Sequence, residues 1–356
     1  METHKKNGCR EKHLLSTLST KLILSSDSSP FQGKLLTLTL LLPALFLSCT
    51  YDTIDMEHAD EEVISRINVK VGDEAEYLDV FTFNDDHTLF LDSYQRVFGS
   101  GDINIRSQSG KKIIFICANL ESDIYDWAGI SSLSSMDQVI SDLKNERRNH
   151  PVMTGSAHAD AGGAESCSVR MERLISEVAI NSIRCDFSGT AYEEEKLRDV
   201  SIYLTNVNSR CSITADGEIR ATQIINSGGL NKDDIKEFKE SDLIYRKLEK
   251  NIGNRRITPG VSFLCYPNTS AKESPGTPYT RLVIEGEIGG QRYWWTIDIN
   301  RDEGGTGIAR NCLYTYDITL RRKGSDSPDS PVEIEDMTIE MKIATWKDKE
   351  DYPVVF

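Results

Sequence analysis

The chain has 356 residues, of which 41 are Lys or Arg and 56 are Asp or Glu, so its formal net charge is −15 at pH 7. A surface this acidic repels phosphate groups, which argues against nucleic acid as a partner and against anionic membrane patches. The length is sufficient for two ordinary domains, each with a hydrophobic core of its own.

An apolar run, residues 35–49, lies behind a lysine and ends at Cys49. It is too short to span a bilayer as a helix, which needs about 20 residues, but it fits the apolar region of an export signal. Ser48 followed by Cys49 resembles the lipobox of bacterial lipoprotein precursors, with Phe46 where Leu is usual. The resemblance implies a signal peptide over residues 1–48, with a long n-region, and acylation of Cys49. A buried helix with an incidental cysteine is the alternative.

Removal of that segment would leave 308 residues with 35 basic and 53 acidic side chains, a net charge of −18. One acyl chain binds a membrane only marginally, so stable anchoring implies more than one chain on Cys49. No later segment of the sequence is long and apolar enough to cross a bilayer. We therefore expect an acidic protein that is held at the outer membrane by lipid.

Six further cysteines follow at wide and irregular spacings: Cys117, Cys167, Cys185, Cys211, Cys265 and Cys312. No CxxC pair occurs among them, so the spacing indicates neither a zinc site nor a dense disulfide framework. Cys117 lies within an apolar segment and is typical of a small core residue. We predict mostly free, buried thiols.

The chain beyond the signal is predicted to be mainly β, because segments with period-two alternation recur between clusters of Gly, Asn, Asp and Ser. The first segment is amphipathic, with Arg66 on its polar face. Its apolar face comprises Val63, Ile67, Val69 and Val71. Segments 78–83 and 113–118 are apolar on both faces, which predicts central strands that are covered on each side. Later strands are expected at 169–183, 200–204, 261–266, 282–288, 293–299 and 314–320.

Two regions depart from the strand pattern. Between Ser134 and Arg148, apolar residues recur at helical spacing, which predicts a short helix. Region 231–250 fits either a short helix or a long loop. A Gly-, Ala- and Ser-rich stretch, 155–168, is the expected domain boundary. We predict two antiparallel β-sandwich domains, at 49–165 and 166–356, since many short alternating strands with frequent turns are typical of that architecture.

The C-terminal region carries a broken alternation. Its apolar positions are Val332 and Ile334, then Met337, Ile339, Met341 and Ile343. The phase slips by one residue at Asp336, and a slip of one reverses the buried face, so it marks a bulge or a break between two strands. Such a strand either closes its own sheet or enters the sheet of a neighbouring molecule.

The sequence contains few signals of chemistry. It has no HExxH and no Gly-x-Ser-x-Gly motif, so we predict no catalytic residue, no metal site and no cofactor. Asp85, Asp86 and Asp92 are better explained as turn residues than as calcium ligands. Trp294 and Trp295 are adjacent on an expected strand, so one of them must face the core. The other could cover an edge or stack on a sugar.

Several short motifs recur in one order along the chain: Leu78-Asp-Val-Phe-Thr-Phe-Asn84, Cys117-Ala-Asn119, Met153-Thr-Gly155, Arg173-Leu-Ile-Ser-Glu-Val178, Tyr266-Pro-Asn268, Arg310-Asn311, and then Tyr314, Tyr316, Ile318, Gly324, Pro331 and Trp346. In content and order they resemble the FimA-type fimbrillins, the subunits and accessory subunits of type V pili in Bacteroidota. Glu177 stands where that family more usually has a basic residue.

The resemblance implies two transthyretin-like β-sandwich domains and a lipoprotein precursor that is carried to the cell surface. It also implies assembly by strand exchange, in which a protease removes the first strand (63–71) and the C-terminal strands of another subunit fill the groove. The donor strands here would be 332–343. Expected partners are other fimbrial subunits in a homo- or heteropolymer, the outer membrane through lipid on Cys49, and receptors on host or bacterial surfaces.

One departure from the family concerns processing. Its protease typically cuts after an arginine beyond the first strand, but no arginine lies between Val71 and Leu78, and Arg66 lies inside the strand. The first strand is therefore retained, as in an anchor subunit, or cut by a protease of other specificity, or cut at Arg66 before or during local opening. Two other functions stay open: a monomeric surface lipoprotein that binds glycan near Trp294, and an exported hydrolase.

Overall fold

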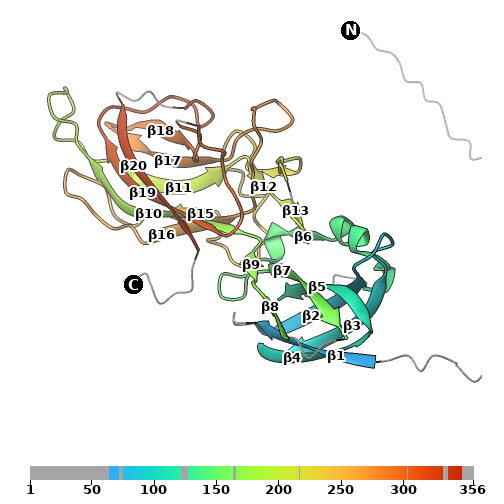
Figure 1. Ribbon diagram of the computed structural model, residues 1–356. Helices are drawn as coiled ribbons and strands as arrows, with labels where there is room; N and C mark the ends of the chain where they lie inside the picture. Colours follow the sequence, from blue (N-terminus) through green and yellow to red (C-terminus); the bar gives the residue numbers. More distant parts are fainter. Residues whose placement is uncertain are drawn as a thin grey trace, which may run out of the picture. The chain divides into compact units, whose positions relative to one another are not determined.

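The computed structural model describes residues 64–71 (backbone only), 75–121, 127–162, 166–215, 217–302, 304–331 and 336–346. All of them belong to one compact unit, which spans residues 59–356. The protein is mainly β, as predicted, and its sheets pack face to face (Figure 1). Most neighbouring strands are antiparallel, but two of the sheets are mixed, since 68–71 pairs parallel with 166–169 and 177–185 pairs parallel with 313–320.

A three-stranded and a five-stranded sheet form the first sandwich. The three-stranded sheet has the order β4-β1-β8, with β4 at Gly101–Gln108, β1 at Ile64–Val71 and β8 at Ser166–Val169. The five-stranded sheet has the order β3-β2-β5-β7-β9, with β3 at Leu91–Phe98, β2 at Tyr77–Asn84, β5 at Gly110–Ala118, β7 at Met153–Ala161 and β9 at Glu172–Arg173.

The core between these sheets follows from strand alternation. Ile103 and Ile105 of β4 and Val169 of β8 pack against Leu78 and Val80 of β2. The opposite face of the five-stranded sheet is also covered: Phe81 and Phe83 of β2 and Phe115 and Cys117 of β5 belong to a second apolar cluster. The prediction that 78–83 and 113–118 are central strands, buried on both faces, is confirmed.

Two four-stranded sheets form the second sandwich. One has the order β16-β10-β19-β20, with β16 at Val261–Cys265, β10 at Ser176–Cys185, β19 at Cys312–Leu320 and β20 at Met337–Thr345. The other has the order β15-β11-β17-β18, with β15 at Tyr245–Lys247, β11 at Arg198–Thr205, β17 at Arg281–Ile288 and β18 at Gln291–Asp298. Gly289 and Gly290 join β17 to β18 with φ of 58° and 80°, the left-handed values of a type I′ hairpin.

Small elements complete the described chain. Two-stranded pairs join β12 (Val207–Asn208) to β14 (Ile224–Ile225) and β13 (Arg210–Ser212) to β6 (Ile140–Asp142). Three 3-10 turns lie at Trp127–Gly129 (η1), Leu133–Gln138 (η2) and Leu143–Asn145 (η3). Region 231–250 is a loop that ends in β15 rather than a helix. In the part of the chain described here, no helix has the length and apolar character needed to cross a membrane.

The helix predicted between Ser134 and Arg148 was wrong. The structure places η2, β6 and η3 there in succession, because β6 pairs with β13 from a distant part of the chain. Met136 and Leu143 are fully buried, so the helical spacing correctly marked buried positions and not the backbone conformation. Tertiary pairing overrides local propensity in this segment.

Strands β7 and β8 occupy most of the stretch 155–168, which was expected to mark the domain boundary. Gly155 is needed in β7 for close backbone approach: an ideal Cβ there would lie 2.3 Å from the carbonyl oxygen of Arg170. Strands β8 and β9 follow residue 165 yet pair with β1 and β7, which precede it. The predicted boundary between domains 49–165 and 166–356 stays a prediction.

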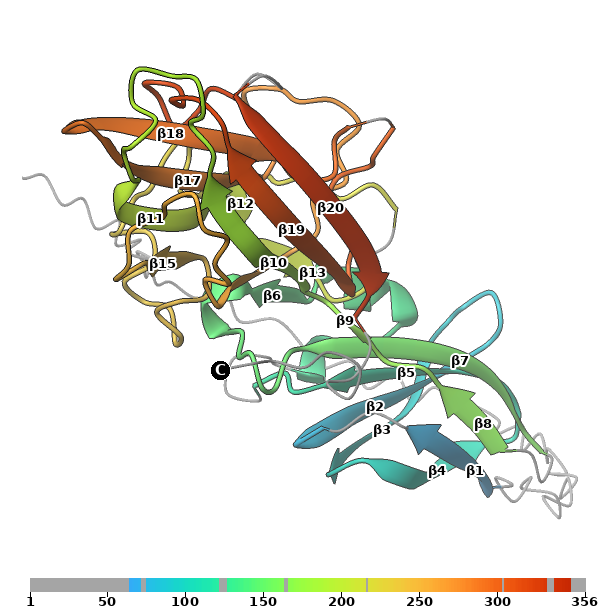
Figure 2. The same ribbon diagram turned by 90° about the vertical axis from the view of Figure 1, so that its left-hand side faces the viewer.

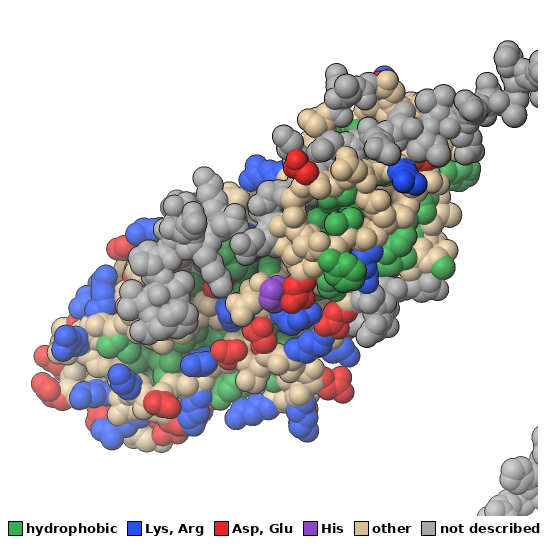
Figure 3. Space-filling view, turned by 90° about the horizontal axis from the view of Figure 1, so that it is seen from below, with side chains coloured by type: hydrophobic (Ala, Val, Ile, Leu, Met, Phe, Trp, Pro, Cys, Tyr) green, Lys and Arg blue, Asp and Glu red, His purple; other side chains and the backbone are tan. Residues whose placement is uncertain are grey.

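All six cysteines in the described residues are free, and four of them are buried, as predicted: Cys117, Cys185, Cys211 and Cys265. Charged side chains of both signs are interspersed over the face shown in Figure 3, with apolar side chains between them.

Candidate functional site

The predicted first strand is β1, and it occupies the centre of the three-stranded sheet (Figure 2). It runs antiparallel to β4 along its whole length and parallel to β8 from Asn68 onward. The register pairs Ile67 with Ile105 and Val69 with Ile103, positions at which the β4 side chains are buried. The backbone of β1 therefore closes one face of the first core.

Arg66 pairs in register with Arg106, an exposed position of β4. This half of β1 has β4 on one side and precedes the pairing with β8. The peptide bond after Arg66 therefore lies in the half of β1 that pairs with one neighbouring strand and not with two. Val63 and the proposed lipidation residue, Cys49, lie outside the described residues, so both stay predictions.

The expected donor region contains β20, an edge strand that pairs with β19 from Leu320↔Met337 to Cys312↔Thr345 (Figure 2). Its apolar row is covered unevenly. Met337 is 3% exposed, Ile339 and Met341 are half-buried, and Ile343 is 50% exposed. The sequence left two placements open for this strand, in its own sheet or in the sheet of a neighbouring molecule. In the single chain, it pairs with β19 and closes its own sheet. Val332 and Ile334 lie outside the described residues.

The break predicted at Asp336 coincides with the start of β20. The Asp336 carbonyl accepts hydrogen bonds from the backbone N–H groups of Arg321 and Arg322 at 2.9 and 3.2 Å. At the other end, the Arg173 guanidinium lies 4.9 Å from the centre of the Trp346 ring and donates to the Trp346 carbonyl at 3.0 Å. Both ends of β20 are thus tied to the chain by contacts that would have to open before the strand could leave.

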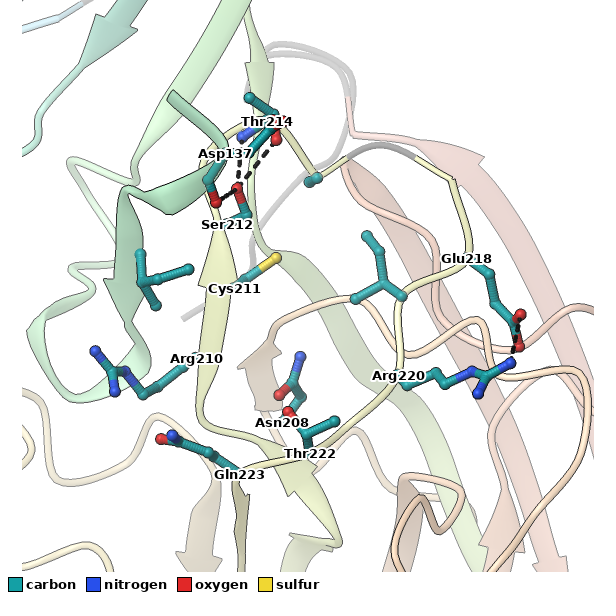
Figure 4. A pocket seen from close by; sticks show the side chains of 13 residues that line it. Asp137, Asn208, Arg210, Cys211, Ser212, Thr214, Glu218, Arg220, Thr222 and Gln223 are labelled. Carbon is teal, nitrogen blue, oxygen red and sulfur yellow. Dashed lines mark hydrogen bonds and ion pairs between the residues drawn. The ribbon is translucent and has the colours of Figure 1, made fainter. Parts of the chain in front are cut away.

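A cleft of about 560 Å³, lined by both polar and apolar side chains, lies beside β13 (Figure 4). On one side, the Ser212 hydroxyl donates to the Asp137 carbonyl at 3.0 Å. On the other, Arg220 pairs with Glu218 at 3.0 Å. The thiol of Cys211 is buried, and burial raises its pKa to about 12, so it is protonated and a weak nucleophile at neutral pH.

The two tryptophans divide as predicted. Trp295 is fully buried, and its indole N–H donates to the Arg322 carbonyl at 3.0 Å. Trp294 is half-buried and lines a second cleft, of about 430 Å³, on the outer face of the β15-β11-β17-β18 sheet.

The three aspartates considered as calcium ligands have other roles. The Asp86 carboxylate accepts from the backbone N–H and the hydroxyl of Thr88, as expected of a turn residue. Asp85 contacts His158 at 3.0 Å, and Asp92 pairs with the buried Lys112 at 3.4 Å.

The structure contains a buried carboxyl group, that of Glu146, which the sequence did not predict. The Tyr266 hydroxyl donates to Glu146 Oε1 at 2.9 Å and accepts from the Ser141 hydroxyl at 2.7 Å, while the Val152 N–H donates to Glu146 Oε2 at 3.1 Å. Burial raises the pKa of Glu146 to about 7, although these N–H and O–H donors lower it. Glu146 lies in the polar run Asn145-Glu-Arg-Arg148, which is typical of a solvent-exposed segment. The local sequence therefore does not indicate that Glu146 is buried.

Comparison by sequence finds no matching family model and no matching curated protein. Comparison by structure finds similar folds. A candidate cell adhesion protein from Bacteroides eggerthii has a TM-score of 0.61 at 14% identity, over 80% of this chain and 96% of that chain. A second, from Parabacteroides distasonis, has a TM-score of 0.59 at 15% identity, over 82% and 99%. The fimbrilin FimA of Porphyromonas gingivalis has a TM-score of 0.58 at 14% identity, over 79% and 97%.

At these identities the likeness concerns the fold alone, and it extends over nearly the whole of each related structure. The chain therefore has the fold of a fimbrilin and of candidate cell adhesion proteins of Bacteroidota, as the order of its sequence motifs predicted.

Proposed function

We propose that the protein is a structural or accessory subunit of a cell-surface fimbria, exported as a lipoprotein through Cys49 and joined to neighbouring subunits by strand exchange. The fold neighbours support a fimbrial or adhesive role. The observation that carries the proposal is the placement of two strands: β1 at the centre of a three-stranded sheet over a core, and β20 at the edge of another sheet.

Removal of β1 would separate β4 from β8 and leave both with unpaired backbone groups along one edge. It would also uncover Ile103, Ile105 and Val169, which pack in the first core. Unpaired backbone beside an apolar floor is the acceptor that strand addition requires.

The donor would be the C-terminal strand of another subunit, with the alternating positions Met337, Ile339, Met341 and Ile343. Full burial of four such side chains contributes about 1.5–3 kcal/mol each, or about 6–12 kcal/mol before the cost of ordering is subtracted. In the single chain Ile343 is 50% exposed, so about half of its contribution would be gained only on transfer to another subunit.

Processing decides which role the subunit has. Cleavage at Arg66 would remove only the first residues of β1, the half that lacks β8 as a neighbour. Retention of the whole strand would fit an anchor or accessory subunit. The N-terminus of protein recovered from cells, measured by mass spectrometry, separates these roles. Acylated Cys49 means a retained strand, a start at Ile67 means that part of β1 is retained, and a start beyond Val71 means an opened groove.

The donor assignment is tested by a matched pair on β20. Met341→Asp places a charge on the apolar row, whereas Lys342→Asp places the same charge on the exposed neighbouring position. Polymers counted by electron microscopy are expected to disappear in the first variant and persist in the second, at equal surface amounts by immunoblot. Normal polymers from the Met341→Asp variant would exclude β20 as donor.

The alternative function is a monomeric outer-membrane surface lipoprotein that binds glycan. One observation favours it, the half-buried Trp294 in the lining of the second cleft. A protein that stays monomeric on cells with its first strand retained would support this alternative over the fimbrial subunit.

A further inference from the structure

The second cleft, here called the sheet-face cleft, is built by strand register. Four residues stand in one row across the sheet: Lys247 of β15, Ser201 of β11, Glu285 of β17 and Trp294 of β18. Tyr203, two residues along β11, shares this face because successive strand residues alternate. The floor of the cleft is therefore polar and aromatic, although the sheet's other face packs in the core.

Two loops raise walls over this floor, at Gly229 to Lys232 and at Pro328. The Thr296 hydroxyl donates to the Pro328 carbonyl at 2.9 Å, which fixes one wall to β18. The fully buried Asn226 fixes the other, since its Nδ2 donates to the Leu204 carbonyl at 2.9 Å. Both walls are thus positioned by the fold before any ligand arrives.

The charged groups on the floor hold one another in place. A bulge in β11 projects Asp199, whose φ is 49°, toward Lys247 at 2.6 Å and Arg292 at 2.5 Å. Arg292 also contacts Glu285, which accepts a hydrogen bond from the Tyr203 hydroxyl at 3.0 Å. Hydrogen bonds from Lys247 and Arg292 lower the pKa of Asp199 to about 2, so this array is charged at neutral pH.

Lys232 differs from the other two cations of the cleft. Among the described residues no carboxylate contacts its ammonium group, whose nitrogen lies 5.4 Å from the centre of the Tyr245 ring. The lining holds three cations, Lys232, Lys247 and Arg292, and two carboxylates, Asp199 and Glu285. Glu287, which pairs with Arg292 at 2.6 Å, adds a third carboxylate beside the cleft, so the charges balance and Lys232 is left as the cation that no carboxylate contacts among the described residues.

Aromatic faces beside fixed hydrogen-bonding groups match one ligand chemistry. A pyranose ring presents C–H groups on its faces and hydroxyls at its rim, so it can stack on an aromatic side chain while its hydroxyls bond to planar charged groups. The volume, about 430 Å³, lies within the range of ligand sites and is enough for a short saccharide. The unpaired cation adds a preference for a negative substituent.

We propose that the sheet-face cleft binds an acidic saccharide, with a sugar ring stacked on Trp294, hydroxyls bonded to Arg292 and Asp199, and a carboxylate paired with Lys232. Binding of this ligand does not depend on strand exchange, since every residue of the cleft lies in the second sandwich, away from β1 and β20. Saccharide binding can therefore be tested independently of polymer formation.

The test uses trigalacturonic acid and its trimethyl ester, which have the same rings and differ in charge. Titration calorimetry on the purified protein is expected to show at least about tenfold tighter binding of the acid, the effect of one charged hydrogen bond. Lys232→Gln should abolish that preference and leave binding of the ester unchanged. Lys236→Gln, which changes an exposed lysine outside the cleft, should keep the wild-type preference.

The aromatic platform is tested by Trp294→Ala and Trp294→Phe, each with its melting temperature measured to show that it is folded. Trp294→Ala should weaken both ligands at least about tenfold, and Trp294→Phe should retain most of the affinity. The proposal is overturned if neither ligand binds at millimolar concentration, if the wild type binds acid and ester equally, or if a folded Trp294→Ala protein binds as the wild type does.

Discussion

Replacement of Glu146 by glutamine should change how the stability of this protein depends on pH. The carboxyl group is 1% exposed, and its pKa is raised from 4.5 to about 7 by burial. The folded state therefore retains a proton that the unfolded chain loses above about pH 4.5. Stability falls as pH rises wherever the folded state binds more protons, so the free energy of unfolding should decline between pH 4.5 and 7.

The magnitude follows from the pKa difference. Each pKa unit corresponds to about 1.36 kcal/mol, so the rise from 4.5 to about 7 corresponds to about 3 kcal/mol. Glutamine is uncharged and can still accept from Tyr266, but its amide cannot accept the Val152 N–H, a loss of about 1 kcal/mol. At pH 8 the Glu146→Gln variant should be more stable than the wild type by about 2 kcal/mol.

Urea unfolding at several pH values from 4.5 to 8 measures this effect as the difference between variant and wild type, which removes the contribution of other titrating groups. Glu237→Gln is the control, because that side chain is 80% exposed and should follow the wild type. A difference that does not vary with pH, or that grows toward low pH, would refute the assignment of the raised pKa to Glu146.

Two further substitutions test the first sandwich, each by urea unfolding. Asp79 is fully buried and accepts hydrogen bonds from Arg96 at 2.8 and 2.7 Å and from Tyr94 at 2.7 Å. Asp79→Ala should therefore lower the free energy of unfolding by about 3 kcal/mol, because it leaves a partly buried guanidinium unpaired. Gly155→Ala should cost about 2 kcal/mol or more, since its Cβ would meet the Arg170 carbonyl at 2.3 Å and the backbone must shift.

The controls are Asp102→Ala at an exposed position and Gly276→Ala, where an added Cβ would meet no atom within 4 Å. Both should stay within about 0.5 kcal/mol of the wild type. Equal effects of Gly155→Ala and Gly276→Ala would show that β7 tolerates a side chain at its crossing with Arg170.

The local sequence pattern predicted the structure correctly where the residues of a single strand determine which of its faces are buried. The alternation at 78–83 and 113–118 predicted strands that are covered on both faces, and the structure bears this out. Adjacent aromatic residues on one strand must point to opposite faces, which is why Trp295 is buried and Trp294 is not. The motif order predicted the fimbrilin-like fold that comparison of structures shows.

Other features depend on segments that are distant in sequence, and no local pattern contains them. Pairing of β6 with β13 replaced the expected helix at 134–148, and β7 pairs with β5 through most of the Gly-, Ala- and Ser-rich stretch that was expected to mark the domain boundary. Glu146 is buried only because Tyr266 and Val152 approach it.

The sheet-face cleft combines four strands and two loops, so its residues are neighbours only in the folded chain. The sequence by itself thus determined which segments are strands and which of their faces are apolar. Tertiary structure decided which strands pair and which charges are buried, because register and burial depend on contacts between residues that lie far apart along the chain.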